Sequence, residues 1–423
     1  MTIHVASPAK SIHIISLGVG EKPNLAESTI KLLKNIDVII GSQRQLNTIH
    51  VYEHSGVELE LPKLTELEDI VQQFSGKSIA VLASGDALFY GIGNWFNRKF
   101  SKHRLIFHPN ISSIQAACHE VGLDAHQMEV VSLHGRPLST LRASIQNQRH
   151  YALFTDSGST PNKVAEQLNQ LGFENSTLWV CERLGYPNQV ISQFSVKSLL
   201  DSSIDVDPLH VTLIKTQGRG GILPEFPGIA DAAFATEKEQ GQGLLTKREV
   251  RLNVLSLLQP TANDVGWDIG AGCGGVAIEW ARWNRLGHVY AIERNSERYT
   301  KLLENREHFG VGLNLTTLQA TAPACLSKLP KPNAVFVGGT GGSIQEILNY
   351  AWNALAIEGR LVATGVTEQT KAELLAFATA QFNAEAQWVE IAVSRGDKLA
   401  GHLLMRPQLP VTIMTLTKSR RLM

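Results

Sequence analysis

The segment Val265–Glu279, VGWDIGAGCGGVAIE, restricts most tightly how this chain can fold. It begins with a short apolar run, Val265–Ile269, which is typical of a buried parallel strand. The run is followed by a cluster of small residues: Gly270, Ala271, Gly272, Cys273, Gly274 and Gly275. Apolar residues then recur at helical spacing, and a second apolar run, His288–Ile292, ends in Glu293. The pattern predicts strand, glycine turn, helix and strand, an arrangement in which backbone amides and a helix N-terminus face a bound ligand.

The spacing of the glycines indicates which ligand to expect. They follow G-x-G-x-G, whereas dinucleotide-binding loops that cradle phosphates follow G-x-G-x-x-G. Glu293 comes where the hydroxyl pair of a ribose needs an acceptor. A looser loop followed by an acid suits the adenosine and methionine parts of S-adenosylmethionine (SAM). A structural glycine turn in an ordinary α/β sheet is the alternative.

Length and charge exclude several classes of protein. At 423 residues the chain is long for one domain, so two α/β domains are expected. Its 39 Lys and Arg balance 39 Asp and Glu, and this net charge of +0 gives no strong field for nucleic acid or an anionic membrane. Four scattered cysteines without a C-x-x-C pair indicate a reduced, cytoplasmic protein. We expect neither a signal peptide nor a membrane-spanning segment.

Two turns in the N-terminal half lie where ligands of α/β sheets bind. The apolar run Ile12–Leu17 predicts a strand that ends at a glycine turn, but no acid follows the next strand, Val38–Ile40. The run Ile79–Ala83 predicts another strand, with the small residues Ser84 and Gly85 and the acid Asp86 at its carboxyl end. Such a turn can hold the amine or hydroxyl of a ligand. An Asx turn in which Asp86 caps a helix is the alternative.

Longer motifs in this half resemble the tetrapyrrole (precorrin) methylase family. The matching stretches are GVGEKP (18–23), SGDALFYGIG (84–93), HPNISSIQAA (108–117), VSLHGR (131–136) and FTDSGSTPNKVAEQL (154–168). The VSLHGR stretch is similar to the branch that methylates C5 of the corrin precursor. The resemblance implies a two-lobed α/β methyltransferase domain over residues 11–215, with SAM between its lobes. The implied SAM-binding residues are Gly18, Gly20, Ser84, Gly85, Asp86, Ser112 and Ser113. The chain departs from the family's usual Gly-Pro-Gly at Glu21-Lys22, and Ala87 replaces a proline.

Two residues of the VSLHGR stretch are candidates for binding substrate. Arg136 beside His134 can hold a carboxylate through a forked hydrogen bond, and precorrins carry many acetate and propionate arms. A solvated loop pair is the alternative.

The chain changes character after residue 215. Residues 216–243 are rich in glycine with mixed charges, and predict an inter-domain linker. Residues 244–258 predict a helix with Thr246 as N-cap and Glu249 as its capping-box partner. Near its start lies a basic cluster of Lys247, Arg248 and Arg251, which is either a solvated face or a set of anchors for carboxylates.

The C-terminal half resembles the decarboxylating C15 methyltransferases of the same pathway. The resemblance covers about residues 228–400 and depends on TKREVR (246–251), WDIGAGCGG (267–275) and VFVGGTGGS (335–343). It implies a Rossmann-like class I methyltransferase domain, which we place at 244–410. The implied SAM-binding residues are Thr246, Gly270, Ala271, Gly272, Cys273, Gly274, Glu293 and Ala322. The chain departs from the family at Cys273, where threonine is usual, and at Thr321, where an adenine-binding carboxylate is usual.

The two resemblances together imply a bifunctional SAM-dependent methyltransferase of cobalamin biosynthesis. Its expected reactions on precorrin-6Y are methylation of C5 and C15 and decarboxylation of the C12 acetate. We expect Lys247, Arg248 or Arg251 to anchor carboxylates and the acetate to lie near Gly339 and Gly342. Both families suggest a homo-oligomer. No catalytic acid or base is assigned.

Two other functions remain open at this point. Related folds methylate RNA, although the chain has no stripe of basic and aromatic residues for nucleic acid. Alternatively, one half is a non-catalytic tetrapyrrole carrier or SAM sensor. No metal is expected, because His50 and His54 have helical spacing but lack a third ligand nearby in sequence.

Overall fold

The structure, a computed structural model, describes residues 11–100, 104–220, 224, 226–238, 243–339, 341–381 and 384–419. Contacts between Cα atoms divide the chain into two compact units. The N-terminal unit contains Met1–Gly135 and Asn147–Gly218, and the C-terminal unit contains Arg136–Gln146 and Arg219–Met423. Residues 136–146, with the 3₁₀ helix Leu138–Ala143, therefore pack with the second unit despite their place in the sequence.

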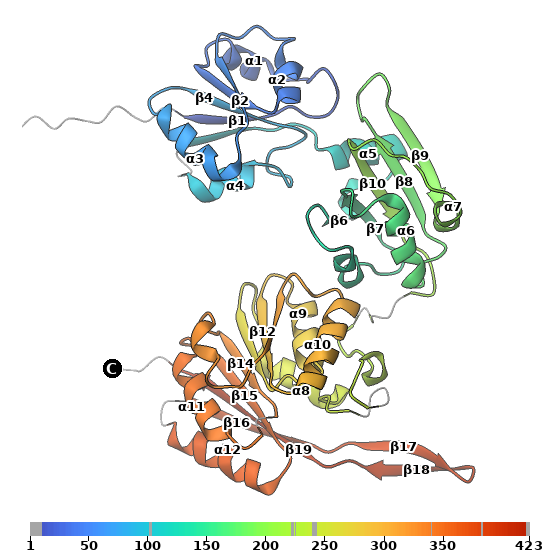
Figure 1. Ribbon diagram of the computed structural model, residues 1–423, viewed down its shortest axis with the longest axis vertical. Coiled ribbons are helices and arrows are strands. Elements are labelled where there is room, and N and C mark those ends of the chain that lie inside the picture. Colours follow the sequence, from blue (N-terminus) through green and yellow to red (C-terminus); the bar gives the residue numbers. More distant parts are fainter. Residues whose placement is uncertain are drawn as a thin grey trace, which may run out of the picture. The chain divides into compact units, whose positions relative to one another are not determined.

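The first lobe of the N-terminal unit is a parallel sheet with helices on both faces (Figure 1). Its strands lie in the order β3 (Val57–Glu60), β2 (Val38–Gly41), β4 (Ile79–Ala83), β1 (Ile12–Ser16) and β5 (Leu105–His108). Its helices are α1 (Glu27–Leu33), α2 (Gln43–Ile49), α3 (Leu64–Gln73) and α4 (Gly93–Lys99). Every residue of β4 is buried, and alternate residues join two separate hydrophobic clusters. A strand covered on both faces needs such an unbroken apolar run, which is why the sequence predicted it.

The second lobe of this unit is a mixed sheet. Its strands lie in the order β6 (Met128–Ser132), β7 (His150–Phe154), β10 (His210–Lys215), β8 (Thr177–Glu182) and β9 (Val190–Ser195). Only β6 and β7 pair in parallel. Its helices are α5 (Ser113–Val121), α6 (Pro161–Gln170) and α7 (Val196–Asp201), with a 3₁₀ turn at Ala125–Gln127.

The C-terminal unit contains a seven-stranded sheet. Its strands lie in the order β13 (Leu315–Gln319), β12 (His288–Glu293), β11 (Val265–Ile269), β14 (Ala334–Val337), β15 (Arg360–Gly365), β19 (Val411–Lys418) and β16 (Ala384–Ile391). The helices are α8 (Arg248–Leu258), α9 (Gly275–Trp283), α10 (Ser296–His308), α11 (Ile344–Ala354) and α12 (Glu368–Ala380), with 3₁₀ turns at Asp231–Ala233 and Leu326–Lys328. The strands from β13 to β15 are parallel, whereas β19 runs antiparallel to both of its neighbours. The order reverses between β11 and β14, and ligands of such sheets bind at that point. The predicted α/β class with a Rossmann-like C-terminal domain is confirmed.

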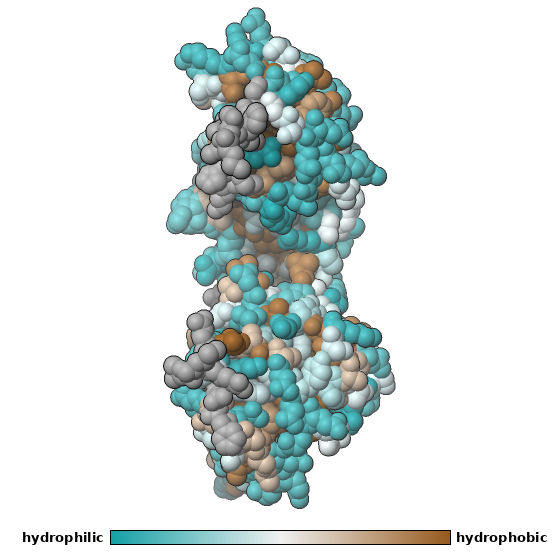
Figure 2. All heavy atoms as spheres, turned by 90° about the vertical axis from the view of Figure 1, so that its left-hand side faces the viewer, coloured by the Kyte–Doolittle hydropathy of each residue, from teal (hydrophilic) through white to brown (hydrophobic). Residues whose placement is uncertain are grey.

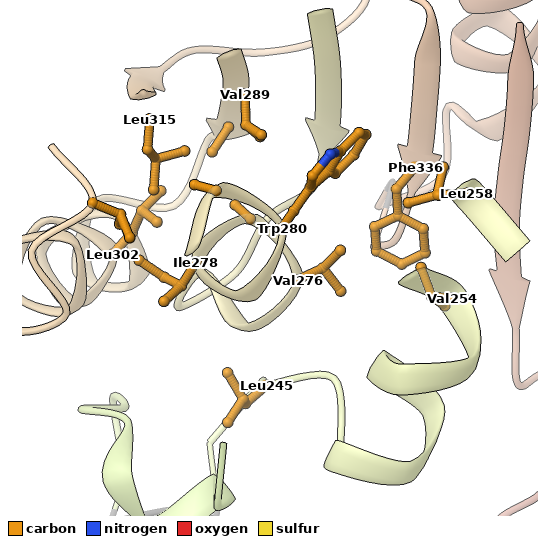
Figure 3. Packing of buried hydrophobic residues seen from close by; sticks show 14 of the residues in the cluster. Leu245, Val254, Leu258, Val276, Ile278, Trp280, Val289, Leu302, Leu315 and Phe336 are labelled. Atoms are coloured by element: carbon orange, nitrogen blue, oxygen red, sulfur yellow. The ribbon is translucent and has the colours of Figure 1, made fainter. Parts of the chain in front are cut away.

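One core of this sheet is built around Trp280 of α9 (Figure 3). Val276 and Ile278 of the same helix join it, together with Phe336 of β14. Trp280 packs over β11 at Gly266, where a Cβ would lie 2.4 Å from Cζ2 of the indole. The strand therefore has glycine at this position because the indole occupies the space of a side chain.

The structure corrects two local expectations around residue 246. Helix α8 begins at Arg248, and its N-cap Lys247 makes no capping hydrogen bond through its side chain. The predicted capping box of Thr246 and Glu249 is wrong, because Glu249 instead accepts a hydrogen bond from Arg395 at 2.6 Å. The expected linker, parts of which lie outside the described residues, is not simply a connection, since Ile229 and Phe234 are buried in the core of the C-terminal unit.

A two-stranded hairpin, β17 (Ser394–Leu399) and β18 (His402–Pro407), projects from the C-terminal unit (Figure 1). Every residue of β18 is exposed, including Leu403 and Met405. Elsewhere, hydrophilic residues cover most of the face drawn in Figure 2. Among the helices that the structure describes, none combines the length and hydropathy of a membrane span.

Candidate active sites

The N-terminal unit contains a cavity of about 440 Å³ at the carboxyl ends of β1 and β4. All seven SAM-binding residues that the resemblance implied for this half line it: Gly18, Gly20, Ser84, Gly85, Asp86, Ser112 and Ser113. His134 lines it as well, whereas Arg136 does not and groups with the other unit. The structure therefore brings the two signature loops together around one space.

The backbones of the two loops are joined. Gly18 and Gly85 exchange amide-to-carbonyl hydrogen bonds of 3.0 and 2.8 Å, and both have positive φ angles of 71° and 63°. Gly20 has a φ of 99°, and a Cβ there would lie 2.6 Å from the carbonyl oxygen of Gly185. Such angles and such close approach favour glycine, so these residues shape the cavity through the absence of side chains.

The polar residues of the loops have structural partners. Asp86 accepts hydrogen bonds from the amides of Leu88 and Phe89 at 2.8 and 3.1 Å, which is the Asx turn named as the alternative. Ser112 forms a capping box with Gln115 at the start of α5. Asp86 still lines the cavity, so the turn positions this carboxylate at the wall.

Sequence reasoning missed the contribution of α2 to this cavity. Arg44, Gln45 and Thr48 line it. The Arg44 guanidinium and the Gln45 amide donate to Ser84 Oγ at 3.0 and 3.1 Å. The spacing of 44, 45 and 48 on a helix that follows a buried strand was the available signal.

The VSLHGR turn is held by Asp156. The amide of Gly135 donates to Asp156 Oδ2 at 2.7 Å. This hydrogen bond, with others from Ser159 and Gly158 and the nearby His134, lowers the pKa of the Asp156 carboxyl. The ionised form is therefore favoured where it orients the loop that carries His134.

The C-terminal unit contains a second cavity, of about 500 Å³, between β11 and β14 at their carboxyl ends. Eight of the predicted residues line it: Thr246, Lys247, Gly270, Ala271, Gly272, Glu293, Ala322 and Gly339. Cys273, Gly274, Arg248, Arg251 and Gly342 do not.

Glu293 fixes the glycine loop. It is only 4% exposed, and its carboxylate accepts from the amides of Gly272 and Asn295, both at 2.8 Å. Each carboxylate oxygen keeps further acceptor capacity after one such bond. The same side chain can therefore orient the loop and accept hydrogen bonds from a ligand hydroxyl.

Asp268, next to this loop, is buried without a conventional partner. Neither carboxylate oxygen makes a hydrogen bond to a described residue. Burial, and secondarily the charge of Glu293, raise the pKa of Asp268 to about 7. The amide of Ala277 opposes this shift without meeting hydrogen-bond geometry. A carboxyl that titrates near neutrality thus lies behind the glycine loop.

Two residues that were predicted to bind the cofactor, Cys273 and Gly274, lie outside the cavity and have structural contacts instead. The Cys273 thiol is fully buried, donates to Glu237 Oε2 at 3.1 Å, and has its pKa raised to about 12 by burial and by Glu237. It is therefore neither a ligand contact nor a nucleophile. Gly274 has a φ of 92° and starts α9, where a Cβ would lie 2.4 Å from Leu302.

The prediction that Arg251 anchors a substrate is wrong. Its side chain is 0% exposed, and its Nε donates to Glu279 at 2.8 Å. Its Nη1 donates to Asp231 at 3.1 Å and to the carbonyl of Thr246 at 2.7 Å, while the ring of Phe234 lies 4.9 Å from Cζ. A guanidinium with these partners is part of the core and is closed to ligands. The partly exposed side chain of Arg248 also lies outside the cavity.

Two arginines that the sequence did not single out line this cavity. Arg294 follows Glu293 directly and forms no hydrogen bond or ion pair within the described part of the chain. Its guanidinium lies over the glycine turn after β14, since a Cβ at Gly341 would meet Nη2 at 2.1 Å. Arg298, on the first turn of α10, pairs with Glu237 at 3.5 Å. With Lys247, the cavity therefore has three cationic side chains.

Comparisons with known proteins match both halves of the chain. Residues 11–200 match the family model described as "Tetrapyrrole (Corrin/Porphyrin) Methylases", and residues 237–418 match "Precorrin methyltransferase domain". A "Precorrin-6Y C(5,15)-methyltransferase [decarboxylating]" of Sinorhizobium sp is 33% identical over 95% of both chains. A "Probable cobalt-precorrin-6B C(15)-methyltransferase (decarboxylating)" of Methanothermobacter thermautotrophicus is 34% identical over 40% of this chain and 86% of its own. A "Cobalt-precorrin-7 C(5)-methyltransferase" of Salmonella typhimurium is 26% identical over 44% of this chain and 91% of its own. The chain belongs to the precorrin-6Y C(5,15)-methyltransferase (decarboxylating) family.

Proposed function

We propose that this chain methylates C5 and C15 of precorrin-6Y from SAM and removes the C12 acetate carboxyl as CO2. The observation that supports this most directly is the presence of two separate glycine-lined cavities, one in each unit. Relatives that span nearly the whole chain are named for both methylations, and shorter relatives are named for one each. These names do not favour the RNA-methylating or carrier alternatives.

The residues of both cavities suit SAM. In the C-terminal unit, Glu293 offers a carboxylate for a ribose, Gly270–Gly272 expose backbone groups to the ligand, and Ala322 lines the cavity where the family resemblance implies adenine. In the N-terminal unit, the joined loops at Gly18 and Gly85 present backbone groups, the small side chain of Ser84 and the carboxylate of Asp86. When bound, SAM supplies a methyl group activated by its sulfonium.

The protein's own contribution to methyl transfer is alignment. The loops that line each cavity are fixed by backbone hydrogen bonds, which limits how a bound molecule can move. Holding two reactants in a productive orientation is worth roughly 7–11 kcal/mol. In this proposal no side chain acts as a nucleophile.

The cations of the C-terminal cavity bind carboxylate arms that remain on the product. Lys247, Arg294 and Arg298 face a substrate with several acidic arms. A cation on the departing carboxylate would stabilise the ground state and slow CO2 loss. We therefore place the C12 acetate near the apolar lining residues of the cavity, such as Ile347 and Val366, where removal from water favours decarboxylation into the conjugated macrocycle.

A matched pair of variants tests the division of labour. Gly20→Ala introduces a Cβ 2.6 Å from the Gly185 carbonyl oxygen in the N-terminal cavity, and Gly270→Ala introduces one 2.1 Å from the Gly339 carbonyl oxygen in the C-terminal cavity. Mass spectrometry of a precorrin-6Y reaction with the unchanged chain should show two added methyls and loss of CO2. Gly20→Ala should yield no C5-methylated product, and Gly270→Ala should yield no decarboxylated product. Loss of the same single step in both variants would contradict the assignment.

We also propose that copies of this chain associate through the β17–β18 hairpin. The hairpin forms a sheet of its own and exposes Leu399, Leu403, Leu404 and Met405. Exposed apolar side chains on edge strands are protected when a second copy covers them. The double substitution Leu403→Lys and Met405→Lys should lower the mass measured by light scattering, and an unchanged mass would contradict this interface.

A further inference from the structure

Three side chains with metal-ligating atoms converge at the C-terminal end of α2. His50 is the C-cap of α2, His54 lies in the loop that follows, and Glu58 is the second residue of β3. The sequence argument against a metal depended on the lack of a third ligand. Glu58 supplies that ligand, because the loop folds back and brings β3 beside the helix end.

The ligating atoms are close together. Nε2 of His50 lies 2.8 Å and Nε2 of His54 lies 3.1 Å from the same Glu58 oxygen, Oε1. The two imidazole rings are stacked, with centroids 6.1 Å apart and an angle of 20° between their planes. One ligand atom from each residue lies within 4.8 Å of the other two. No other group of three such residues is found in the part of the chain that the structure describes.

The backbone that carries these residues is fixed at both ends. Helix α2 begins with a capping box at Ser42 and buries Leu46 and Ile49. Glu58 pairs with Ile39 in the β3–β2 ladder, and the ladder is extended by a bond from the Val57 amide to the Asp37 carbonyl. His50 and Glu58 therefore lie at the ends of two anchored elements, which lowers the entropy lost on binding, and His54 lies in the loop that joins them.

We propose that His50, His54 and Glu58 bind a divalent transition metal of the Zn²⁺ type. Two imidazoles and one carboxylate suit Zn²⁺, Co²⁺ or Ni²⁺, whereas Mg²⁺ and Ca²⁺ prefer oxygen ligands only. Bonds of about 2.0–2.2 Å in a tetrahedron separate the ligand atoms by about 3.3–3.5 Å. The nitrogen–oxygen distance must therefore open by about 0.2–0.4 Å from 3.1 Å at His54 and by about 0.5–0.7 Å from 2.8 Å at His50. A water molecule takes the fourth position, because His50 and Glu58 are partly exposed.

The surroundings limit the affinity. Without metal, both imidazoles can donate to Glu58, and the metal must replace these hydrogen bonds. Nδ1 of His54 is shielded from solvent and has no partner among the described residues. Ligating histidines gain strength from a bond at their other nitrogen, and its loss costs about ten- to a hundred-fold in affinity. We therefore expect the site to bind the metal with micromolar affinity, which is weaker than the affinity of a structural zinc site with four protein ligands.

The site lies on the element that supports the N-terminal cavity. The same α2 carries Arg44 and Gln45, which donate to Ser84 at the cavity wall. A metal that joins the end of α2 to β3 would hold this helix against the sheet. Its direct effect is therefore stabilisation of the first lobe.

Calorimetric titration of the metal-free full chain with Zn²⁺ tests the proposal. We expect one micromolar site per chain whose affinity falls more than about tenfold in His54→Ala and in Glu58→Gln. Glu60→Gln, an exposed glutamate on the same strand, is the matched control and should leave the affinity unchanged. Thermal unfolding of each variant without metal shows whether it has folded.

X-ray absorption of the Zn²⁺-loaded unchanged chain gives a result that needs no variant. The expected spectrum has nitrogen and oxygen ligands only, with the multiple scattering of two imidazoles. Sulfur ligands, an affinity in both ligand variants equal to that of the unchanged chain, or no binding at millimolar Zn²⁺ would each overturn the proposal.

Discussion

Replacing Glu293 by Gln tests the C-terminal SAM site by exchanging one carboxylate oxygen for an amide nitrogen. The carboxylate is nearly buried and already accepts from the amides of Gly272 and Asn295. A glutamine offers one acceptor oxygen, and its amide group cannot accept from the second backbone N–H or from a ribose hydroxyl. Hydrogen bonds to a charged group contribute about 1.5–3 kcal/mol, so losing one weakens SAM binding about ten- to 150-fold.

Calorimetry with the full chain measures this loss against an internal reference. The proposed N-terminal site shares no residue with the C-terminal cavity, so its affinity should not change. Glu297→Gln, an exposed acid on the first turn of α10, is the matched control. If the Glu293 variant binds SAM at both sites as the unchanged chain does, Glu293 is not the ribose acceptor and the glycine turn is only structural.

Three further predictions concern stability and substrate. Gly266→Ala should destabilise the C-terminal unit by about 1–3 kcal/mol, because its Cβ overlaps the Trp280 indole, and chemical denaturation measures this. Because folding raises the pKa of Asp268 from 3.8 to about 7, the stabilisation that this carboxyl contributes is complete below about pH 3.8 and is lost as the pH rises to about 7. Asp268→Asn should therefore flatten the change in melting temperature between pH 5 and 8, and an unchanged slope would assign it to other groups. Arg294→Gln should raise KM for precorrin about tenfold or more with kcat nearly constant, whereas Arg248→Gln, outside the cavity, should change neither.

The elements and the glycine-lined loops could be predicted because their physical signals are local. Strand β4 is an unbroken apolar run, and the loop between β11 and α9 needs positive φ angles that favour glycine. The residues that line the N-terminal cavity could be predicted because their motifs determine the path of the backbone rather than the position of side chains.

The cationic residues could not be assigned from charge alone. Arg251 lies three residues before Val254 and seven before Leu258, so helical spacing places it on the buried stripe of α8. The spacing thus indicates that the Arg251 side chain is buried. Only the position of Glu279 shows why the buried guanidinium charge is tolerated. Arg294 lines its cavity because the end of β12 meets the glycine turn after β14 in three dimensions, which no short motif records.

The contacts of the buried Arg251 also indicate at which residue this two-unit chain can be divided without loss of core contacts. Its partners Asp231 and Ile229, and the ring of Phe234, all come from the segment before residue 244. A gene fission that began the second polypeptide at residue 244 would leave Arg251 with one acid fewer and remove two core residues. A cut near residue 226 keeps the whole cluster with the C-terminal unit. A C-terminal fragment of this chain should therefore retain residues 226–243 if its core is to keep Ile229, Phe234 and the Asp231–Arg251 pair.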